Sequence, residues 1–220
     1  MPFIVETFFP ADYTSVAPET ISIMNREDLI FYGLIVFVII IILKIYWDSD
    51  SFQLKCVIST VDGNEYCVRE RSKIQLVADL LARVTNKLKQ LVEFMVKKFP
   101  ERENVNRLQE NFNPSKIYET LPTSTHTAYS EDKGRKLAFC VTKKKNGTKL
   151  IDEGTLTFVA IHELAHIMTK SVGHTDEFWN NFRFLLENAK EAGIYEPVDY
   201  KNSPQEYCGM KITDNPYYDL

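Results

Sequence analysis

A continuous apolar segment near the N-terminus limits the folds open to this chain more than any other feature. From Leu29 to Leu43, fifteen consecutive residues are apolar or aromatic, with Gly33 the only exception. Together with residues 45–47, the segment matches the roughly 20 residues that span a bilayer core. The alternative is a buried helix of a soluble domain, but such a helix normally has a polar face and this segment has none. We therefore expect a transmembrane helix over residues 29–47.

The segment does not look like a cleavable signal peptide, because an acidic stretch precedes it and no basic region opens the chain. We expect residues 1–28, which lack periodicity, to form a short flexible tail. Basic residues lie mostly after the segment, beginning with Lys44 and Lys55, whereas only Arg26 precedes it. The positive-inside rule then predicts a single-pass anchor with the C-terminal domain in the cytosol. A glycosylation sequon at 146–148 matters only under the opposite topology.

Charge is distributed unevenly along the chain. Residues 1–50 contain two Lys or Arg against seven Asp or Glu, whereas the remaining 170 residues contain 24 against 23. The formal charge of −4 therefore comes from the N-terminal segment. A near-neutral main domain gives no electrostatic reason to expect tight binding of DNA or RNA.

The domain after the anchor, residues 51–220, combines strand and helix patterns. Phe52–Val68 alternates around an Asp-Gly turn and predicts a β-hairpin. A long helix is expected from Lys73 to Phe99, with Ser72 as its N-cap. Its apolar positions recur every three or four residues: Val77, Leu81, Val84, Leu88, Leu91 and Met95. This stripe favours packing against the domain core, and a homo-oligomeric coiled coil through residues 73–99 is the alternative.

Further elements follow from the same patterns. A short helix over Glu101–Phe112 precedes two strands, Thr127–Ser130 and Lys136–Thr142. Two more helices are expected over Glu153–Ser171, capped by Asp152 and Gly173, and from Thr175 to about Ala192, closed by Gly193. The chain is therefore predicted to have an α+β fold.

The four cysteines do not have the spacing of a disulfide scaffold or of a CxxC metal site. Cys56 and Cys67 can face each other across the predicted hairpin, so one disulfide is an alternative. We favour free thiols.

Residues 162–166, HELAH, carry the clearest chemical signal. Histidines four residues apart lie on one face of a helix, so His162 and His166 can reach the same Zn²⁺ ion. Glu163 lies beside them and can take a proton from a water that the metal activates. The motif predicts one Zn²⁺ per chain and a hydrolytic reaction. The alternative is a buried pair of structural histidines without a metal.

A hydrolytic zinc site needs a third protein ligand and an open position for water. His174 is the best candidate, because Gly173 lets the chain turn sharply just before it. Glu177 and Glu187, on the following helix, are the carboxylate alternatives. We expect His162, His166 and His174 to hold the metal.

The proposed reaction also needs a substrate and a donor for the developing oxyanion. The strand at 136–142 could pair with an extended peptide by strand addition. Three downstream tyrosines are weak candidates for the donor: Tyr195, Tyr200 and Tyr207. Met210 is interpreted as a core methionine, with a support below the metal site as the alternative. His126 belongs to no motif and is interpreted as a surface or turn residue.

The HELAH motif followed by residues 173–179, GHTDEFW, resembles the WLM family of zinc metallopeptidases, which is related to the SprT-like proteases. The resemblance is strongest to membrane-anchored WLM-like proteins of large double-stranded DNA viruses. It extends over most of the chain and includes three further segments: Asp79-Leu80-Leu81, Asn111-Phe112-Asn113-Pro114 and Lys133-Gly134.

This resemblance implies a zincin-like fold with an active-site helix and a small antiparallel sheet. It also implies the three histidines as zinc ligands and Glu163 as the catalytic acid and base. It also implies a host or virion membrane as the location. The chain departs from the family in its linker, because seven residues separate His166 from His174 where five are usual. Cellular WLM proteins act on DNA–protein crosslinks or ubiquitin-like conjugates. The anchor and the near-neutral domain do not fit that substrate, so we do not carry it over.

Two functions follow as expectations. The first is a membrane-anchored zinc endopeptidase that cleaves a protein or peptide substrate. The second is a membrane or virion protein that keeps the zincin fold for structure or interaction without catalysis. A metal-dependent hydrolase of non-protein bonds ranks below both.

Overall fold

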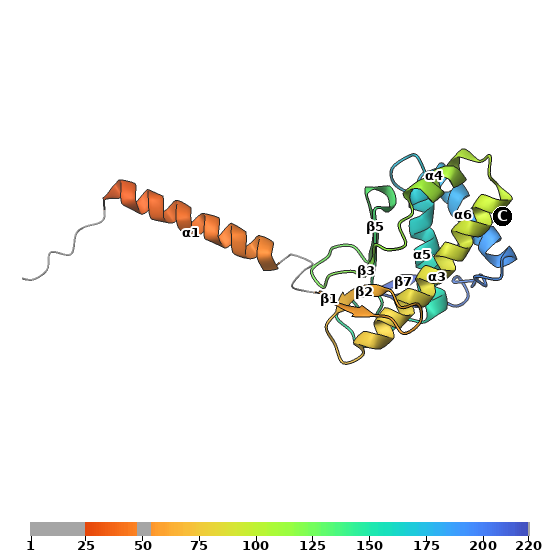
Figure 1. Cartoon of the computed structure of the whole chain (residues 1–220), viewed down its shortest axis with the longest axis horizontal. Coiled ribbons are helices and arrows are strands. Elements are labelled where there is room, and N and C mark those ends of the chain that lie inside the picture. The colour runs from red at the N-terminus through yellow and green to blue at the C-terminus, as the bar shows by residue number, and fades with distance from the viewer. Residues whose placement is uncertain (1–24, 48–53, 220) are drawn as a thin grey trace, which may run out of the picture. The chain divides into compact units, whose positions relative to one another are not determined.

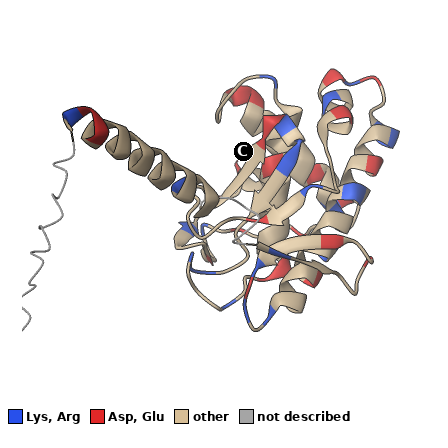
Figure 2. Ribbon diagram, turned by 60° about the vertical axis from the view of Figure 1, so that its left-hand side comes forward, with Lys and Arg blue, Asp and Glu red and all other residues tan. Residues whose placement is uncertain are grey.

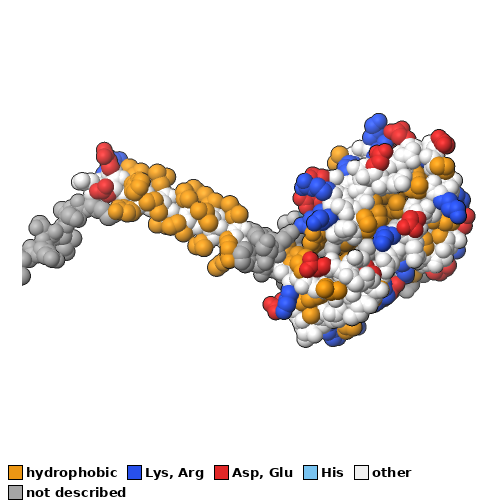
Figure 3. Space-filling view, viewed as in Figure 1, with side chains coloured by type: hydrophobic (Ala, Val, Ile, Leu, Met, Phe, Trp, Pro, Cys, Tyr) orange, Lys and Arg blue, Asp and Glu red, His pale blue; other side chains and the backbone are white. Residues whose placement is uncertain are grey.

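The structure is a computed structural model that describes residues 25–47 and 54–219. It divides into two compact units, 1–44 and 45–220. Helix α1 (Arg26–Trp47) has no buried residue, and Figure 3 shows apolar side chains covering it beyond its charged first turn. By length and composition, α1 could cross a membrane. It begins three residues before the predicted segment, and most of the tail expected over residues 1–28 lies outside the described residues.

The second unit contains a mixed five-stranded sheet in the order β1-β2-β3-β5-β4. Its strands are β1 (Leu54–Ile58), β2 (Glu65–Arg69), β3 (Ile117–Glu119), β4 (Ala128–Glu131) and β5 (Lys136–Phe139). The pairs β1–β2 and β4–β5 are antiparallel, but β3 is parallel to both of its neighbours, so the prediction of an antiparallel sheet was wrong. Strand β5 therefore has a partner on each side. Because both of its sides are paired, β5 cannot accept a substrate strand as predicted. The free edge on this side of the sheet is β4.

Four helices complete the core of this unit. They are α3 (Ile74–Lys98), α4 (Glu103–Asn111), α5 (Glu153–Met168) and α6 (Asp176–Glu191). Helix α5 contacts α3, α4 and α6 and also the strands β4 and β5, so it lies at the centre (Figure 1). Among the described residues, the unit is an α+β domain built around this helix, as predicted.

The apolar stripe of α3 faces that core. All six of its predicted positions are at most 1% exposed. The stripe is therefore unavailable for a coiled coil, and the homo-oligomer through residues 73–99 was the wrong alternative. The expected cap was also wrong, because the N-cap residue is Lys73 and no side chain caps this end.

A small hairpin near the C-terminus did not emerge from the sequence patterns. It consists of β6 (Gln205–Tyr207) and β7 (Met210–Ile212), which pair only with each other. Cys208 and Gly209 form its turn, both with positive φ. Their backbone N–H groups donate to the carbonyls of Thr142 and Lys143, which attaches the hairpin to the chain after β5.

The cysteines form two disulfides, Cys56–Cys67 and Cys140–Cys208, so the prediction of free thiols was wrong. Cys56 and Cys67 are directly opposite in the β1–β2 ladder. Cys140 follows β5, and the fold brings Cys208 to it across a separation of 68 residues. Such a pairing depends on tertiary structure, which cysteine spacing alone does not reveal.

Charged side chains of both signs are interspersed over the second unit (Figure 2). This agrees with the near-neutral composition of residues 51–220.

Candidate metal centre

Helix α5 positions the two histidines of the motif. Asp152 caps the helix as predicted, because its carboxylate accepts a hydrogen bond of 2.8 Å from the Thr155 N–H. His162 and His166 then lie on the same face, one turn apart, with ring centroids 4.9 Å from each other. The helix ends at Met168, earlier than the predicted end near Ser171, and Thr169 is its C-cap.

The linker after α5 is fixed by side chains from two other parts of the chain. Lys133 donates from its ammonium to the carbonyls of Thr169 and Ser171, both at 2.9 Å. The Glu177 carboxylate accepts from the backbone N–H groups of Lys170, at 2.8 Å, and of Ser171, at 3.0 Å. These bonds explain how a seven-residue linker keeps a defined shape.

The linker returns His174 to the face of α5 that carries the other two histidines. Gly173 has φ +86°, and nothing lies within 4 Å of the position that a Cβ would take, so its conformation rather than its space requires glycine. Thr175 caps α6 as predicted, accepting from the Phe178 N–H at 3.4 Å. The predicted turn at Gly173 therefore exists, although it does not end the helix.

The three histidines converge on one point. Nε2 of His174 lies 3.1 Å from Nε2 of His162 and 3.1 Å from Nε2 of His166. Two ligands 2.0–2.1 Å from a tetrahedral zinc ion are separated by about 3.3–3.4 Å, so the cluster has nearly the right size. The donor set, three imidazole nitrogens, also fits zinc.

Electrostatics keep two of these imidazoles in the neutral form that binds metals. Burial, with smaller contributions from the neighbouring imidazoles, lowers the pKa of His162 to about 3. Burial, His174 and Lys133 lower the pKa of His166 to about 4. Neutral imidazole carries the free lone pair that a cation requires.

The structure does not bring the carboxylate alternatives to this cluster. Glu177 uses its oxygens on the linker, and those hydrogen bonds lower its pKa to about 2. Glu187 is exposed on α6. Cys56, Glu65 and Cys67 also lie close together, but both sulfurs of that group are in the disulfide.

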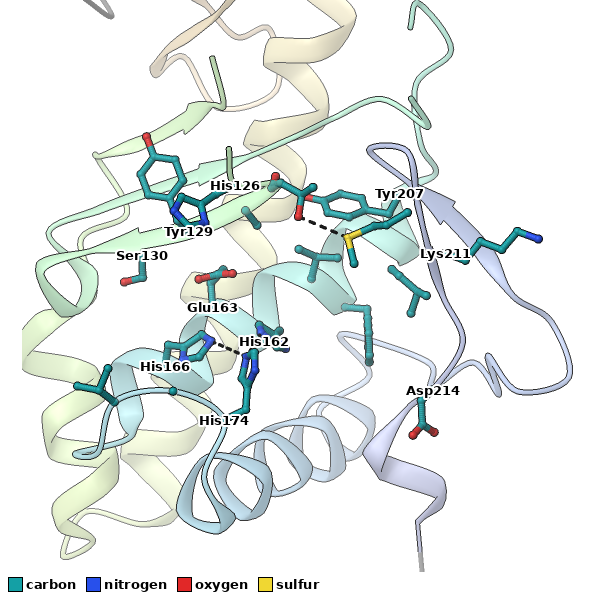
Figure 4. A pocket seen from close by; sticks show the side chains of 18 of the residues that line it. His126, Tyr129, Ser130, His162, Glu163, His166, His174, Tyr207, Lys211 and Asp214 are labelled. Carbon is teal, nitrogen blue, oxygen red and sulfur yellow. Dashed lines mark hydrogen bonds between the residues drawn. The ribbon is translucent and has the colours of Figure 1, made fainter. Parts of the chain in front are cut away.

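Glu163 lies beside the histidines and is 5% exposed. Within the described part of the chain, no group donates a hydrogen bond to its carboxylate, which projects into a cavity (Figure 4). Burial raises its pKa to about 8. A buried carboxyl without a partner is costly to keep, and such groups concentrate at functional sites.

The cavity has a volume of about 920 Å³ and is bounded by four segments. Helix α5 and the loop at 172–174 form one side. Strand β4 with the residues before it and the β6–β7 hairpin form the other sides (Figure 4). Apolar side chains make up much of the lining, among them Phe158, Val159 and Ile212. The cavity is large enough for several residues of an extended peptide.

The tyrosines predicted as oxyanion donors are engaged elsewhere. The hydroxyls of Tyr195 and Tyr200 lie 3.4 Å apart, and neither residue lines the cavity. Tyr207 lines it, but its hydroxyl donates to the Thr127 carbonyl at 2.9 Å. Met210 is 51% exposed on the cavity wall, so the interpretation as a core methionine was wrong.

Two residues near the site were missed in the sequence. Lys133 was only part of a family resemblance, and nothing in its surroundings predicts contact with a linker 36 residues away. His126 was interpreted as a surface or turn residue. It is indeed exposed, but it lines the cavity.

No family model matches the chain, and no solved structure matches it. It is similar to an uncharacterized protein of Acanthamoeba polyphaga mimivirus, 28% identical over 167 residues, which cover 71% of this chain and 81% of that protein.

It is also similar to uncharacterized proteins of Invertebrate iridescent virus 6 and Invertebrate iridescent virus 3. They are 33% and 34% identical over 75 and 76 residues, about a third of this chain and less than half of either relative. These relatives come from large double-stranded DNA viruses, as the sequence resemblance predicted. They carry no described activity over to this chain.

Proposed function

We propose that this protein is a zinc-dependent endopeptidase whose ligands are His162, His166 and His174. The observation that carries the proposal is the juxtaposition of three converging imidazoles with the buried carboxyl of Glu163, which has no partner among the described residues. The open cavity above them supplies space for a substrate. The resemblance to WLM metallopeptidases, with their zincin-like fold, supports the same function.

The residues have separate roles in this reaction. Zinc, when bound, would polarise the scissile carbonyl and lower the pKa of an attacking water. Glu163 takes the proton from that water and passes it to the leaving amine. The apolar residues around Glu163 exclude bulk water and strengthen its electrostatic interactions.

Strand β4 gives the substrate an orientation. It lies at one of the two edges of the sheet, β1 being at the other, and it lines the cavity along Ala128, Tyr129 and Ser130. An extended peptide can add to such an edge through main-chain hydrogen bonds, while its side chains occupy the apolar cavity. This replaces the substrate strand predicted at residues 136–142 by its neighbour in the sheet.

The test compares Glu163→Gln with the wild-type full chain in detergent. We expect near-stoichiometric zinc in both and cleavage of an unfolded protein substrate by the wild type alone. Glu187→Gln, an exposed glutamate on α6, is the matched control and should retain activity. Cleavage by Glu163→Gln would exclude the proposed base, and absence of zinc would exclude the metal. Zinc without any cleavage would favour the catalytically silent membrane protein.

We also propose that α1 anchors the domain in a membrane and that the domain faces an oxidising compartment. This reverses the cytosolic side predicted from charge. Lys44 lies in the last turn of α1, and Lys55 is the only Lys or Arg in the 20 residues after the helix, so the positive-inside signal is small. Two disulfides point the other way, because disulfides are rare in the cytosol.

The sequon provides the test of this orientation. Asn146 and Thr148 are both exposed, with Asn146 in a turn. Expression in a eukaryotic cell should give a glycosidase-sensitive mass shift that Asn146→Gln removes. An unglycosylated chain whose cysteines react with a cytosolic thiol reagent would restore the cytosolic prediction.

A further inference from the structure

The position of His126 has a mechanistic consequence that rests on the proposed hydrolysis. Attack of water on a peptide carbonyl places a negative charge on the carbonyl oxygen. Donors aimed at that oxygen account for large parts of the rate in such reactions. Because the three predicted tyrosines are engaged or lie elsewhere, the cavity must offer another donor.

Four other polar side chains that line the cavity are unsuited to this role. The Oγ of Ser130 is closed off from solvent, although it has no partner among the described residues. In Figure 4 the hydroxyl of Tyr129 and the ammonium of Lys211 both point away from the histidine cluster. Lys133 is held by the linker carbonyls.

His126 meets the requirements. It is exposed, so a substrate can reach it, and its imidazole has no hydrogen-bond partner within residues 25–47 and 54–219. Figure 4 shows the ring on the β4 side of the cavity, across from Glu163 and the three histidines. A peptide lying along β4 would pass between these two sets of groups.

The backbone around His126 is fixed on both sides, so the ring is presented from a defined place. Ser124 Oγ accepts from the His126 N–H and donates to its carbonyl, both at 3.1 Å. The next carbonyl, of Thr127, accepts from the Tyr207 hydroxyl at 2.9 Å and from the Cys140 N–H at 2.8 Å. The Tyr129 ring lies beside the imidazole, with centroids 6.1 Å apart.

We propose that His126 is a second catalytic residue, whose ring N–H donates a hydrogen bond to the carbonyl oxygen as the water attacks. The new C–O bond places the charge on that oxygen, and Glu163 holds the proton that the water loses. When the C–N bond breaks, the amine leaves with that proton and the carbonyl re-forms. His126 is a hydrogen-bond donor throughout and transfers no proton.

The test uses zinc-loaded full chain in detergent and three variants. His126→Ala should lower kcat by about 10²–10³-fold, the usual effect of losing one oxyanion donor, with KM and zinc content little changed. His126→Gln keeps an N–H donor and should recover part of kcat. Thr125→Ala, an exposed neighbour on the same loop, should match the wild type. A rise in KM with kcat unchanged, or no change in either, would overturn the proposal.

A binding measurement separates this inference from the proposed function. A phosphinic peptide mimics the tetrahedral oxyanion and can be titrated calorimetrically without turnover. His126→Ala should weaken its binding at least tenfold, whereas Thr125→Ala should not. If the wild type cleaves nothing but this difference appears, the endopeptidase function fails and the oxyanion contact stands. Equal binding by the wild type and His126→Ala, or no binding by either, would overturn the role of His126.

Discussion

The two sides of the histidine cluster are built in different ways. His162, Glu163 and His166 come from one helix, and their arrangement follows from helical spacing and a cap at Asp152. His174 comes from a linker whose shape depends on Lys133 and Glu177. The first side needs only a formed and packed helix, whereas the second needs contacts between distant segments.

The opposite wall of the cavity is assembled in the second way too. Strands β6 and β7 are three residues each and pair only with each other. A two-stranded hairpin is marginally stable by itself, so the Cys140–Cys208 disulfide and the bonds to Thr127, Thr142 and Lys143 must hold it. The site thus combines one side that local sequence determines with two sides that depend on contacts between distant segments.

The largest effect is expected when a histidine ligand itself is replaced. His162→Ala and His174→Ala should both reduce bound zinc from about one ion per chain to a small fraction, because two ligands remain. Metal analysis after dialysis measures this loss. His126→Ala, a histidine outside the cluster, is the control and should keep its zinc.

The metal-free proteins should then differ in stability. His162 is partly buried, with its ring centroid 4.8 Å from that of Phe178 and 5.1 Å from that of Phe182. His174 also lies beside Phe178, with centroids 4.6 Å apart, but it is exposed, so its removal leaves less of a cavity. Truncating the packed ring should cost about 2 kcal/mol and lower Tm by roughly 4–8 °C. His174→Ala should change Tm by less than about 2 °C. Equal shifts in calorimetry would contradict the contrast between the two sides.

The second prediction concerns the cross-linked wall. Replacing both cysteines of the Cys140–Cys208 pair by serine should lower the free energy of unfolding by about 4 kcal/mol, because the bond closes a long loop. The matched control is the Cys56–Cys67 pair, which closes a short loop in an exposed hairpin and should cost about 3 kcal/mol. Denaturant titration measures both.

Activity should distinguish the two pairs more sharply than stability does. Only the first substitution frees the hairpin that lines the cavity, so only it should raise KM for a peptide substrate. A similar rise in KM for both pairs would show that the hairpin does not need its disulfide.

The difference between the sides also explains what could be predicted from the sequence. The motif helix, its cap, the burial of the α3 stripe and the turn at Gly173 all depend on spacing within a few residues. The disulfide across 68 residues and the contacts of Lys133 depend on where distant segments meet. Local patterns contain no information about such meetings, so free thiols were favoured and Lys133 was overlooked.

The same reasoning applies to the errors at the sheet. Alternation identified both strands near residue 140, but it does not say which of them has a neighbour on each side. The parallel pairing of β3 with β5 makes β5 internal and leaves β4 at the edge. The position of His126, three residues after the turn at Pro122–Thr123, likewise gains a functional meaning only because β4 packs against α5.

The third prediction weakens the linker through Lys133. Lys133→Met removes two charge-assisted hydrogen bonds to linker carbonyls while keeping an apolar stem. Loss of a group that orients a ligand typically costs 10–100-fold in metal affinity, so we expect a decrease of about that size. Competition with a zinc chelator measures it.

Lys144→Met is the control for the lost charge, because Lys144 is exposed and its side chain makes no described hydrogen bond. Its zinc affinity should equal that of the wild type. An unchanged affinity in Lys133→Met would mean that the linker keeps its shape without this contact.

The smallest effect is expected from Glu177→Gln. The amide oxygen can still accept from one of the two linker N–H groups, of Lys170 or of Ser171, but the second acceptor and the negative charge are lost. Zinc affinity should fall by only a few-fold, roughly half the logarithmic effect of Lys133→Met. Asp176→Asn removes the same charge from the same helix turn without touching the linker, so it should leave zinc affinity unchanged. If both variants lose affinity equally, the charge at the α6 N-terminus matters and the linker contact does not.

The pH dependence adds a second check on this contact. Hydrogen bonds from the linker lower the pKa of Glu177 to about 2. The contribution of its ionised carboxylate to the shape of the linker is therefore fully present above the ordinary pKa near 4.5. It is lost only as the pH falls through about 2. The ratio of zinc affinities between wild type and Glu177→Gln should therefore stay constant from pH 7.5 down to pH 4.5, where a carboxyl with the ordinary pKa would be half protonated. A ratio that shrinks within this range would mean that the pKa of Glu177 is not lowered and that its carboxylate does not bind the linker.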